Sequence, residues 1–298
     1  MMTAPSRPTL RGELRMNEPL KRYNSWRVGG PARQMYLPAD AQDLADFLAA
    51  LPADEPLLWL GLGSNLLIRD GGFRGTVILL QGQLSRLRIE DLDVHVEAGV
   101  ACAKVARECA RANLTGAAFL AGIPGTMGGA LAMNAGAFGG ETWSIVGAVT
   151  TLDRAGVVRE RDPSDFQVAY REVVGPREEW FLACRLHLAR GDAAAEQAAI
   201  RALLERRAAT QPTGLPSCGS TFRNPPGDHA ARLIEASGLK GYRIGGAEVS
   251  TKHANFLITT AQASAADVEN LIAYVRAEVQ RQQGVMLQTE VHMVGEPA

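Results

Sequence analysis

The chain has 298 residues, of which 46% are hydrophobic and 21% charged, and its formal net charge is -1. This composition indicates a globular protein of about two domains, and the balanced charge argues against general binding to nucleic acid or to an anionic membrane surface. The first twenty residues lack the apolar run of a secretory signal, and no stretch is apolar enough for a membrane helix, so we expect a cytoplasmic protein. The four cysteines form no C-x-x-C pair, so we expect reduced thiols and no metal site.

Helices and strands alternate through the first two thirds of the chain. Residues 33–38 are expected to form a strand, and Asp40 to cap the helix that follows it. A helix is predicted over 101–114. Strands are predicted at residues 57–60, 76–80, 92–100, 146–153, 156–162 and 180–188. The first 80 residues therefore hold a βαβ-like unit followed by a further strand.

The last third again mixes short helices and strands. The run GDAAAEQAAI at 191–200 opens an Ala-rich helix that ends before Pro212, and it is the predicted domain boundary. Asp228 is expected to begin a second helix, which Gly238 ends. Ser264 and Asp267 have the spacing of a capping box for a third helix, which Gly284 terminates. A strand over 285–294 closes the chain, and the predicted fold class is α/β and α+β.

Two glycine-rich loops are the strongest local signals of a ligand site. GLGSN at 61–65 follows a strand, so its backbone N–H groups (Gly61, Gly63, Ser64 and Asn65) could surround an anion, although a plain turn is the favoured interpretation of this loop taken alone. The longer stretch AGIPGTMGGALAMNAGAFGGE covers 121–141 and suits close approach of backbone to a ligand or tight helix packing. Its candidate residues are Ile123, Pro124, Gly125, Thr126, Gly128, Gly129, Asn134 and Gly136.

Six segments in order resemble one known family. They are YNSWRVGGPA at 23–32, GLGSNLLIRDGGFRGTVI at 61–78, the stretch 121–141, AYRE at 169–172, PSCGSTFRNP at 216–225 and QTEVHMVGE at 288–296. Together they are similar to the UDP-N-acetylenolpyruvoylglucosamine reductases (MurB), over roughly residues 20–296. The resemblance implies enzymes that use FAD and NADPH to reduce UDP-N-acetylglucosamine enolpyruvate to UDP-N-acetylmuramate for peptidoglycan.

The resemblance also implies a domain organisation. A flexible lead-in over 1–20 would precede an FAD-binding domain of the vanillyl-alcohol-oxidase type at 21–191, with lobes at 21–80 and 81–191, and a substrate-binding domain at 192–298. The glycine loops would hold the FAD pyrophosphate, without a covalent bond because neither loop contains histidine. The short stretch after Arg171 resembles the family's shorter type, which lacks a tyrosine-bearing lid, and a monomer is favoured.

Three residues would then carry the chemistry. Ser220 matches the family's proton donor, with Cys218 as the rival reactive group; Arg171 matches the residue near the substrate carboxylate; Glu290 matches a partner for the developing enol. Val173 stands where the family usually has serine. Expected substrate contacts are Tyr170, Arg223, Asn224, His253 and Asn255.

Two rival functions remain open at this point. One is a flavin oxidase of the same superfamily that uses O2 and an alcohol, against which the GSTFRNP and TEV segments argue. The other is a nucleotide-binding module without catalysis, against which the joint presence of Ser220, Arg171 and Glu290 argues.

Overall fold

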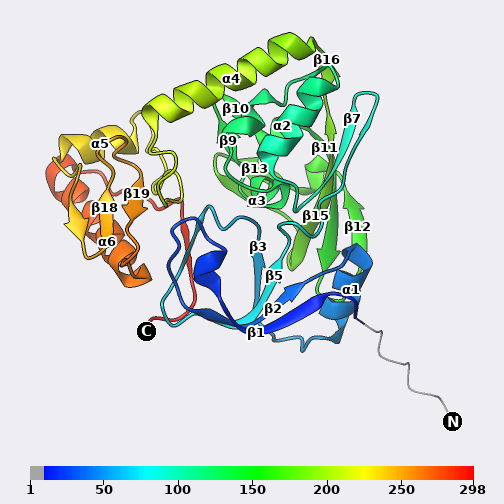
Figure 1. The fold of residues 1–298 in the computed structure, drawn as a ribbon, viewed down its shortest axis with the longest axis horizontal. Helices are drawn as coiled ribbons and strands as arrows, with labels where there is room; N and C mark the ends of the chain where they lie inside the picture. Colours follow the sequence, from blue (N-terminus) through cyan, green and yellow to red (C-terminus); the bar gives the residue numbers. More distant parts are fainter. Residues whose placement is uncertain (1–9) are drawn as a thin grey trace. The chain divides into compact units, whose positions relative to one another are not determined.

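The computed structural model describes residues 10–298, which form two compact units, each assembled from separate stretches of the chain (Figure 1). The first unit contains the described residues up to Arg15 together with 35–61 and 75–198, and the second contains 16–34, 62–74 and 199–298. Residues 1–9 of the predicted lead-in lie outside the described residues. Within the rest of it, Glu13–Pro19 form strand β1.

The first unit is built on two sheets. Most of a four-stranded sheet belongs to it, in the order β1-β2-β5-β3, with β3 and β5 parallel, and a five-stranded antiparallel sheet has the order β12-β11-β15-β7-β6. The strands beyond β1 are β2 (Pro31–Leu37), β3 (Leu57–Leu60), β5 (Phe73–Leu79), β6 (Leu87–Glu90), β7 (Asp93–Glu97), β11 (Val146–Asp153), β12 (Val158–Arg161) and β15 (Glu179–His187).

Helices and short hairpins complete this unit. The N-cap Asp40 accepts a 2.9 Å hydrogen bond from Asp43 N at the start of α1 (Ala41–Ala50), which buries Leu44, Phe47 and Leu48. Helix α2 (Cys102–Arg111) contacts the 3-10 turn at Ala118–Gly122, and α3 (Met127–Ala132) contacts β15. The shorter elements are β8 (Leu114–Thr115) with β16 (Ala189–Arg190), β9 (Gly136–Ala137) with β10 (Gly140–Glu141), β13 (Gln167–Ala169) with β14 (Glu172–Val174), and 3-10 turns at Ala118–Gly122, Thr142–Ile145 and Pro163–Asp165.

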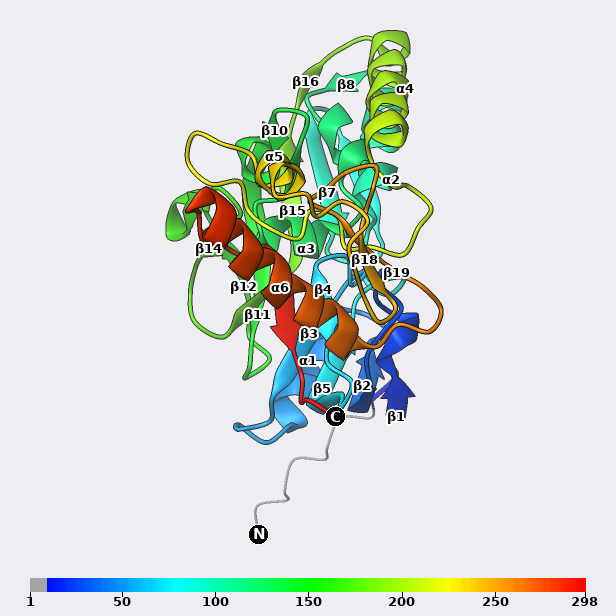
Figure 2. The same cartoon turned by 90° about the vertical axis from the view of Figure 1, so that its left-hand side faces the viewer.

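The second unit has its own core around α6 (Ala265–Gln283), which Figure 2 shows beside β4. Ser264 caps α6 in a capping box with Asp267, and Gly284 ends it with a φ of 71°. The other elements are a 3-10 turn at Leu20–Arg22, β4 (Leu66–Ile68) parallel with β20 (His292–Val294), α5 (Ala230–Ala236), and the antiparallel strands β17 (Arg243–Ile244), β18 (Ala247–Val249) and β19 (Leu257–Thr259). Helix α4 (Ala193–Thr210) ends before Pro212, as the sequence predicts.

The predicted closing strand over 285–294 is wrong in its extent. Only His292–Val294 form a strand, whereas Thr289 makes an isolated bridge with Phe222. The alternation that suggested the strand is nevertheless present, since Leu287 and Val291 are buried and Gln288 between them is exposed. Alternation of apolar and polar residues indicates which side chains are buried. It does not indicate whether the backbone forms hydrogen bonds with a partner strand.

Candidate active site

A cavity of about 310 Å³ in the first unit is the place where the two glycine loops meet. Gly61 at the end of β3 and Thr126, Gly128 and Gly129 around the start of α3 all line it. Aromatic rings form much of the remaining wall, namely Trp59, Phe166, Trp180 and Phe181. A cavity that combines exposed backbone with aromatic faces suits an extended ligand carrying flat rings and phosphates.

The glycines at this cavity have two different roles. A Cβ atom at Gly61 would lie 2.3 Å from Thr126 Oγ1, and one at Gly128 would lie 2.9 Å from the Ala98 Cβ, so these glycines let the loops pack closely. At Gly129 the nearest atom to an added Cβ is Thr126 Oγ1 at 4.0 Å, so the backbone there faces open space. This open space at a glycine is the feature expected where backbone approaches a phosphate, and the cavity therefore fits a dinucleotide such as FAD.

The other predicted cofactor residues do not line this cavity. Gly63, Ser64 and Asn65 belong to the second unit, where Asn65 Nδ2 donates a 3.0 Å hydrogen bond to Glu290 O. Ile123 is buried, Pro124 is exposed, and the Gly125 carbonyl accepts a 2.9 Å bond from Cys102 N at the start of α2. Their assignment to the cofactor stays a prediction.

Arg171 lies in a two-residue turn between β13 and β14, where Ala169 pairs with Glu172. Its φ of 56° is uncommon for a residue with a side chain. The guanidinium donates to Asn134 O at 3.2 Å and to Gly136 O at 2.9 Å, and it lies 5.0 Å from the centre of the Tyr170 ring. Asn134 and Gly136, predicted for the cofactor, thus contact the predicted catalytic arginine.

Ser220 and Glu290 lie on neighbouring stretches of the second unit. Glu290 N donates to Thr221 O at 2.8 Å, and Arg223 N donates to Gln288 O at 2.9 Å. Ser220 directly precedes this pairing and follows Gly219, whose φ of 72° turns the chain. Ser220 and Glu290, 70 positions apart in the sequence, therefore lie on adjacent backbone segments. Both residues are half-buried.

Cys218, the rival of Ser220, is closed off from solvent. It is 3% exposed, its Sγ lies 3.5 Å from Leu66 O, and burial raises the pKa of its thiol far above the ordinary value. A thiol that neither ionises nor reaches solvent is a poor acid or nucleophile. This environment favours the interpretation of Cys218 as a packing residue.

Asn255 supports the Ser220 segment from its other side. Its side chain accepts from Phe222 N at 2.9 Å and donates to Phe222 O at 2.8 Å, while its carbonyl accepts from Thr221 N. The Asn255 side-chain amide thus makes the two hydrogen bonds to the Phe222 backbone that an adjacent strand would otherwise make. Asn255 is 3% exposed, so it is placed to fix this segment, and its predicted contact with substrate stays a prediction.

The remaining predicted substrate residues differ in their surroundings. Asn224 is exposed, and its Oδ1 accepts a 3.1 Å bond from Ala230 N at the start of α5. Tyr170 is 46% exposed, and Arg223 is partly buried. Burial lowers the pKa of His253, whose Nδ1 has no hydrogen-bond partner among residues 10–298.

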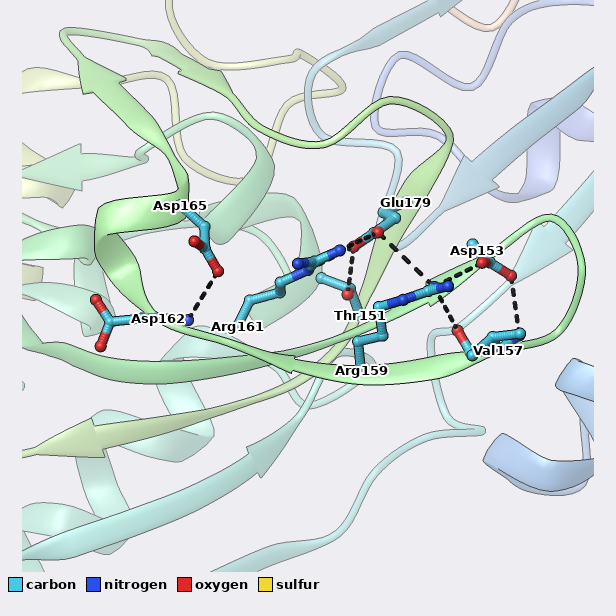
Figure 3. A network of polar contacts seen from close by, with 8 residues as sticks. All are labelled: Thr151, Asp153, Val157, Arg159, Arg161, Asp162, Asp165 and Glu179. Carbon is cyan, nitrogen blue, oxygen red and sulfur yellow. Dashed lines mark hydrogen bonds and ion pairs between the residues drawn. The ribbon is translucent and has the colours of Figure 1, made fainter.

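A carboxylate that the sequence analysis did not single out also lines the cavity. Glu179 accepts hydrogen bonds from Arg161 at 2.5 and 3.1 Å and from Thr151 Oγ1 at 2.7 Å (Figure 3). The hydrogen-bonded Arg161 lowers the pKa of Glu179, which is therefore a charged group beside the aromatic wall. The sequence contains one sign of this aromatic wall. Trp59 lies between Leu58 and Leu60, which are buried, so its side chain points to the opposite face of β3.

The described part of the chain shows neither a metal site nor a membrane-spanning helix. Within residues 10–298, no group of three or more His, Cys, Asp or Glu side chains is arranged to hold a metal ion. No helix in the described part of the chain combines the length and apolarity needed to span a membrane.

Comparison with known proteins assigns the chain to a family. Residues 32–161 match an FAD binding domain, and residues 211–294 match the C-terminal domain of UDP-N-acetylenolpyruvoylglucosamine reductase. The reductase of Alkalilimnicola ehrlichii is 63% identical over 295 residues, covering 99% of both chains, and that of Methylococcus capsulatus is 58% identical over 290 residues, covering 96% of this chain and 94% of its own.

A solved structure agrees with these relatives. The crystal structure of the Thermus caldophilus enzyme (MurB) is 33% identical, covers 96% of this chain and 99% of its own, and superposes with a TM-score of 0.81. The predicted fold class, an α/β and α+β FAD-binding domain with a C-terminal α+β domain, is confirmed. The chain belongs to the UDP-N-acetylenolpyruvoylglucosamine reductase family, in its shorter form, and is an FAD-dependent oxidoreductase.

Proposed function

We propose that this chain reduces UDP-N-acetylglucosamine enolpyruvate to UDP-N-acetylmuramate with NADPH, through non-covalently bound FAD. The observation that carries the proposal is the pairing of residues 221–223 with 288–290, which holds Ser220 close to Glu290. A serine and a carboxylate on paired segments suit an addition across an enol ether, which needs one proton and one group that supports the enol. The family membership supplies the substrate class.

The cavity supports the cofactor assignment. Gly61, Thr126, Gly128 and Gly129 would hold the FAD pyrophosphate, and the aromatic wall would cover a ring of the dinucleotide. When bound, FAD would supply the transfer of hydride from NADPH to the enolpyruvyl carbon. The chain's own residues then have to bind the substrate, orient it and supply a proton.

Each catalytic residue has one task in this scheme. The Arg171 guanidinium would form a charge-assisted contact with the substrate carboxylate, which gains negative charge as the enol develops. Ser220 Oγ would donate its proton to the carbon next to that carboxylate. Glu290 would either stabilise the enol or help to return a proton to Ser220. Arg223, Asn224, His253, Asn255 and Tyr170 remain the predicted contacts for the rest of the substrate.

Several finer assignments accompany this proposal as expectations from the family. They are a substrate-binding domain at 192–298, a cytoplasmic location, a monomeric state and a role in peptidoglycan precursor synthesis.

The proposal is tested by separating the two half-reactions in stopped-flow absorbance of the flavin. Ser220→Ala removes one oxygen atom, so reduction of bound FAD by NADPH should be nearly unchanged, whereas reoxidation by the enolpyruvyl substrate should fall at least about 10²-fold, the usual minimum for a positioned general acid. Cys218→Ala is the matched control and should leave both steps largely intact. Reoxidation at the parent rate in Ser220→Ala, or loss of it in Cys218→Ala, would show that the proton donor is misassigned.

A further inference from the structure

The predicted catalytic Arg171 occupies a backbone conformation that its surroundings must enforce. It is the second residue of a two-residue turn, and its φ of 56° belongs to the left-handed region that disfavours side chains. Contacts from outside the hairpin can offset the cost of this conformation. The structure shows where those contacts come from.

Asn134 binds both the hairpin and the loop that faces it. Its Nδ2 donates to Ala169 O at 3.2 Å, directly before the turn, and to Glu141 Oε2 at 3.0 Å. Its Oδ1 accepts from Trp143 N at 3.1 Å. These partners, a carbonyl and a carboxylate on one side and a backbone N–H on the other, also fix which end of the amide is nitrogen.

The backbone of the same residue contacts Arg171 itself. Asn134 O accepts from Arg171 Nη1 at 3.2 Å, and Gly136 O, two residues later, accepts from Nη2 at 2.9 Å. Asn134 is 2% exposed and has a φ of 42°, a value that asparagine tolerates better than most residues. With both Nδ2 protons used inside the protein, its side chain has little capacity left for a cofactor.

We propose that Asn134 is a positioning residue that sets the place of the Arg171 guanidinium through the 169–172 hairpin. The glycine-rich stretch then has two parts with separate tasks. Thr126, Gly128 and Gly129 line the cavity, and Asn134 and Gly136 bind the arginine. The proposal rests on the proposed function only in assigning Arg171 to the substrate carboxylate.

The test uses two substitutions and a matched control in the FAD-loaded protein. Asn134→Gly keeps the left-handed backbone and removes all three side-chain contacts. Asn134→Asp keeps the acceptor for Trp143 N but removes the donor to Ala169 O. The control is Asn113→Gly, since Asn113 has a φ of 58°, is exposed, and its Oδ1 accepts a 3.2 Å hydrogen bond from Ala193 N, away from the hairpin.

Hydrogen exchange of the hairpin is the readout that needs no enzyme activity. Peptides covering 167–174 should exchange at least about tenfold faster in both Asn134 variants than in the parent or in Asn113→Gly, because the turn loses its external support. Unchanged exchange in both variants would overturn the proposal. This result stands whether or not the chain turns over the proposed substrate, so failure here is distinguishable from failure of the function.

Kinetics then separates positioning from a general structural effect. A misplaced arginine should lower kcat/KM for the enolpyruvyl substrate by about 10- to 10²-fold, while flavin content and the rate of FAD reduction by NADPH stay within about twofold of the parent. Loss of flavin with hairpin exchange unchanged would instead assign Asn134 to the cofactor and overturn the proposal.

Discussion

At the scale of single residues, Gly129 offers the cleanest test of the cofactor cavity. Apart from its chain neighbours and its own helix backbone, a Cβ atom added there meets no protein atom closer than 4.0 Å, so we expect a larger residue to leave the fold unchanged and to reduce the space for a ligand. We expect Gly129→Val to fold with unchanged thermal stability or a small gain, because glycine is costly inside a helix. Flavin occupancy, measured by absorbance after purification, should fall at least about tenfold.

The control for this substitution is Gly147→Ala in β11. An added Cβ there has ordinary contacts at 3.4 Å or more, and Gly147 does not line the cavity, so occupancy should equal that of the parent. Full occupancy in Gly129→Val would show that the ligand does not lie against this glycine.

Glu179 gives a pH-dependent prediction at the same scale. Arg161 lowers the pKa of Glu179 in the folded protein, so the stabilisation from the ionised carboxylate is present at neutral pH and is lost as the pH falls through that lowered value. Glu179→Gln should therefore cost about 1–3 kcal/mol of unfolding free energy at pH 7. The difference from the parent should shrink in urea titrations below about pH 4.

The neighbouring Glu178 supplies the comparison. Its side chain is 65% exposed and contacts Arg154 at 3.2 Å, so Glu178→Gln should change the unfolding free energy by less than about 1 kcal/mol. Equal effects of the two substitutions at pH 7 would mean that burial of Glu179 adds nothing to its ion pair.

At the scale of elements, the start of α6 shows how a distant loop reinforces a helix that the sequence already caps. The Asp70 carboxylate accepts hydrogen bonds from Ala265 N and Ala266 N, both at 2.9 Å, and Arg69 binds Glu269 at 2.9 and 2.7 Å. The capping box of Ser264 and Asp267 was predictable from spacing alone, but this second cap was not, because 195 residues separate Asp70 from Ala265.

We therefore expect Asp70→Ala to destabilise the protein. Loss of a carboxylate that caps two N–H groups should lower the unfolding free energy by about 1–2 kcal/mol, as for other N-cap removals. Chemical denaturation would measure this, with the exposed Asp54→Ala as control. Equal midpoints for the two variants would contradict a stabilising role for Asp70.

At the scale of the whole molecule, the sequence predicts what depends on local patterns. Strands at 57–60 and 146–153, the helix caps at Asp40 and Ser264 and the end at Gly284 all follow from periodicity and capping chemistry. The long closing strand was wrong because alternation does not require a partner strand. Local patterns could not predict that each unit is assembled from separate stretches of the chain. Contacts such as the hydrogen bond from Trp26 Nε1 to Leu257 O join residues 231 positions apart.

The candidate site follows the same division. Residues in ordered motifs, such as Ser220, Arg171 and Glu290, were predicted through the family resemblance, and their roles stay predictions. The aromatic wall, Glu179 and the supporting contacts of Asn134 and Asn255 could not be predicted from the sequence, because each depends on which distant groups a side chain contacts in the fold.

The most direct test of the central claim is an anaerobic titration of the purified protein, followed in the visible flavin band. The protein should be yellow, release FAD on acid treatment, lose its colour with NADPH, and regain it on addition of the enolpyruvyl UDP-sugar, with one equivalent of UDP-N-acetylmuramate formed per flavin. Colour that returns only with O2, or a flavin that NADPH does not reduce, would contradict the proposed reductase and favour an oxidase or a binding module.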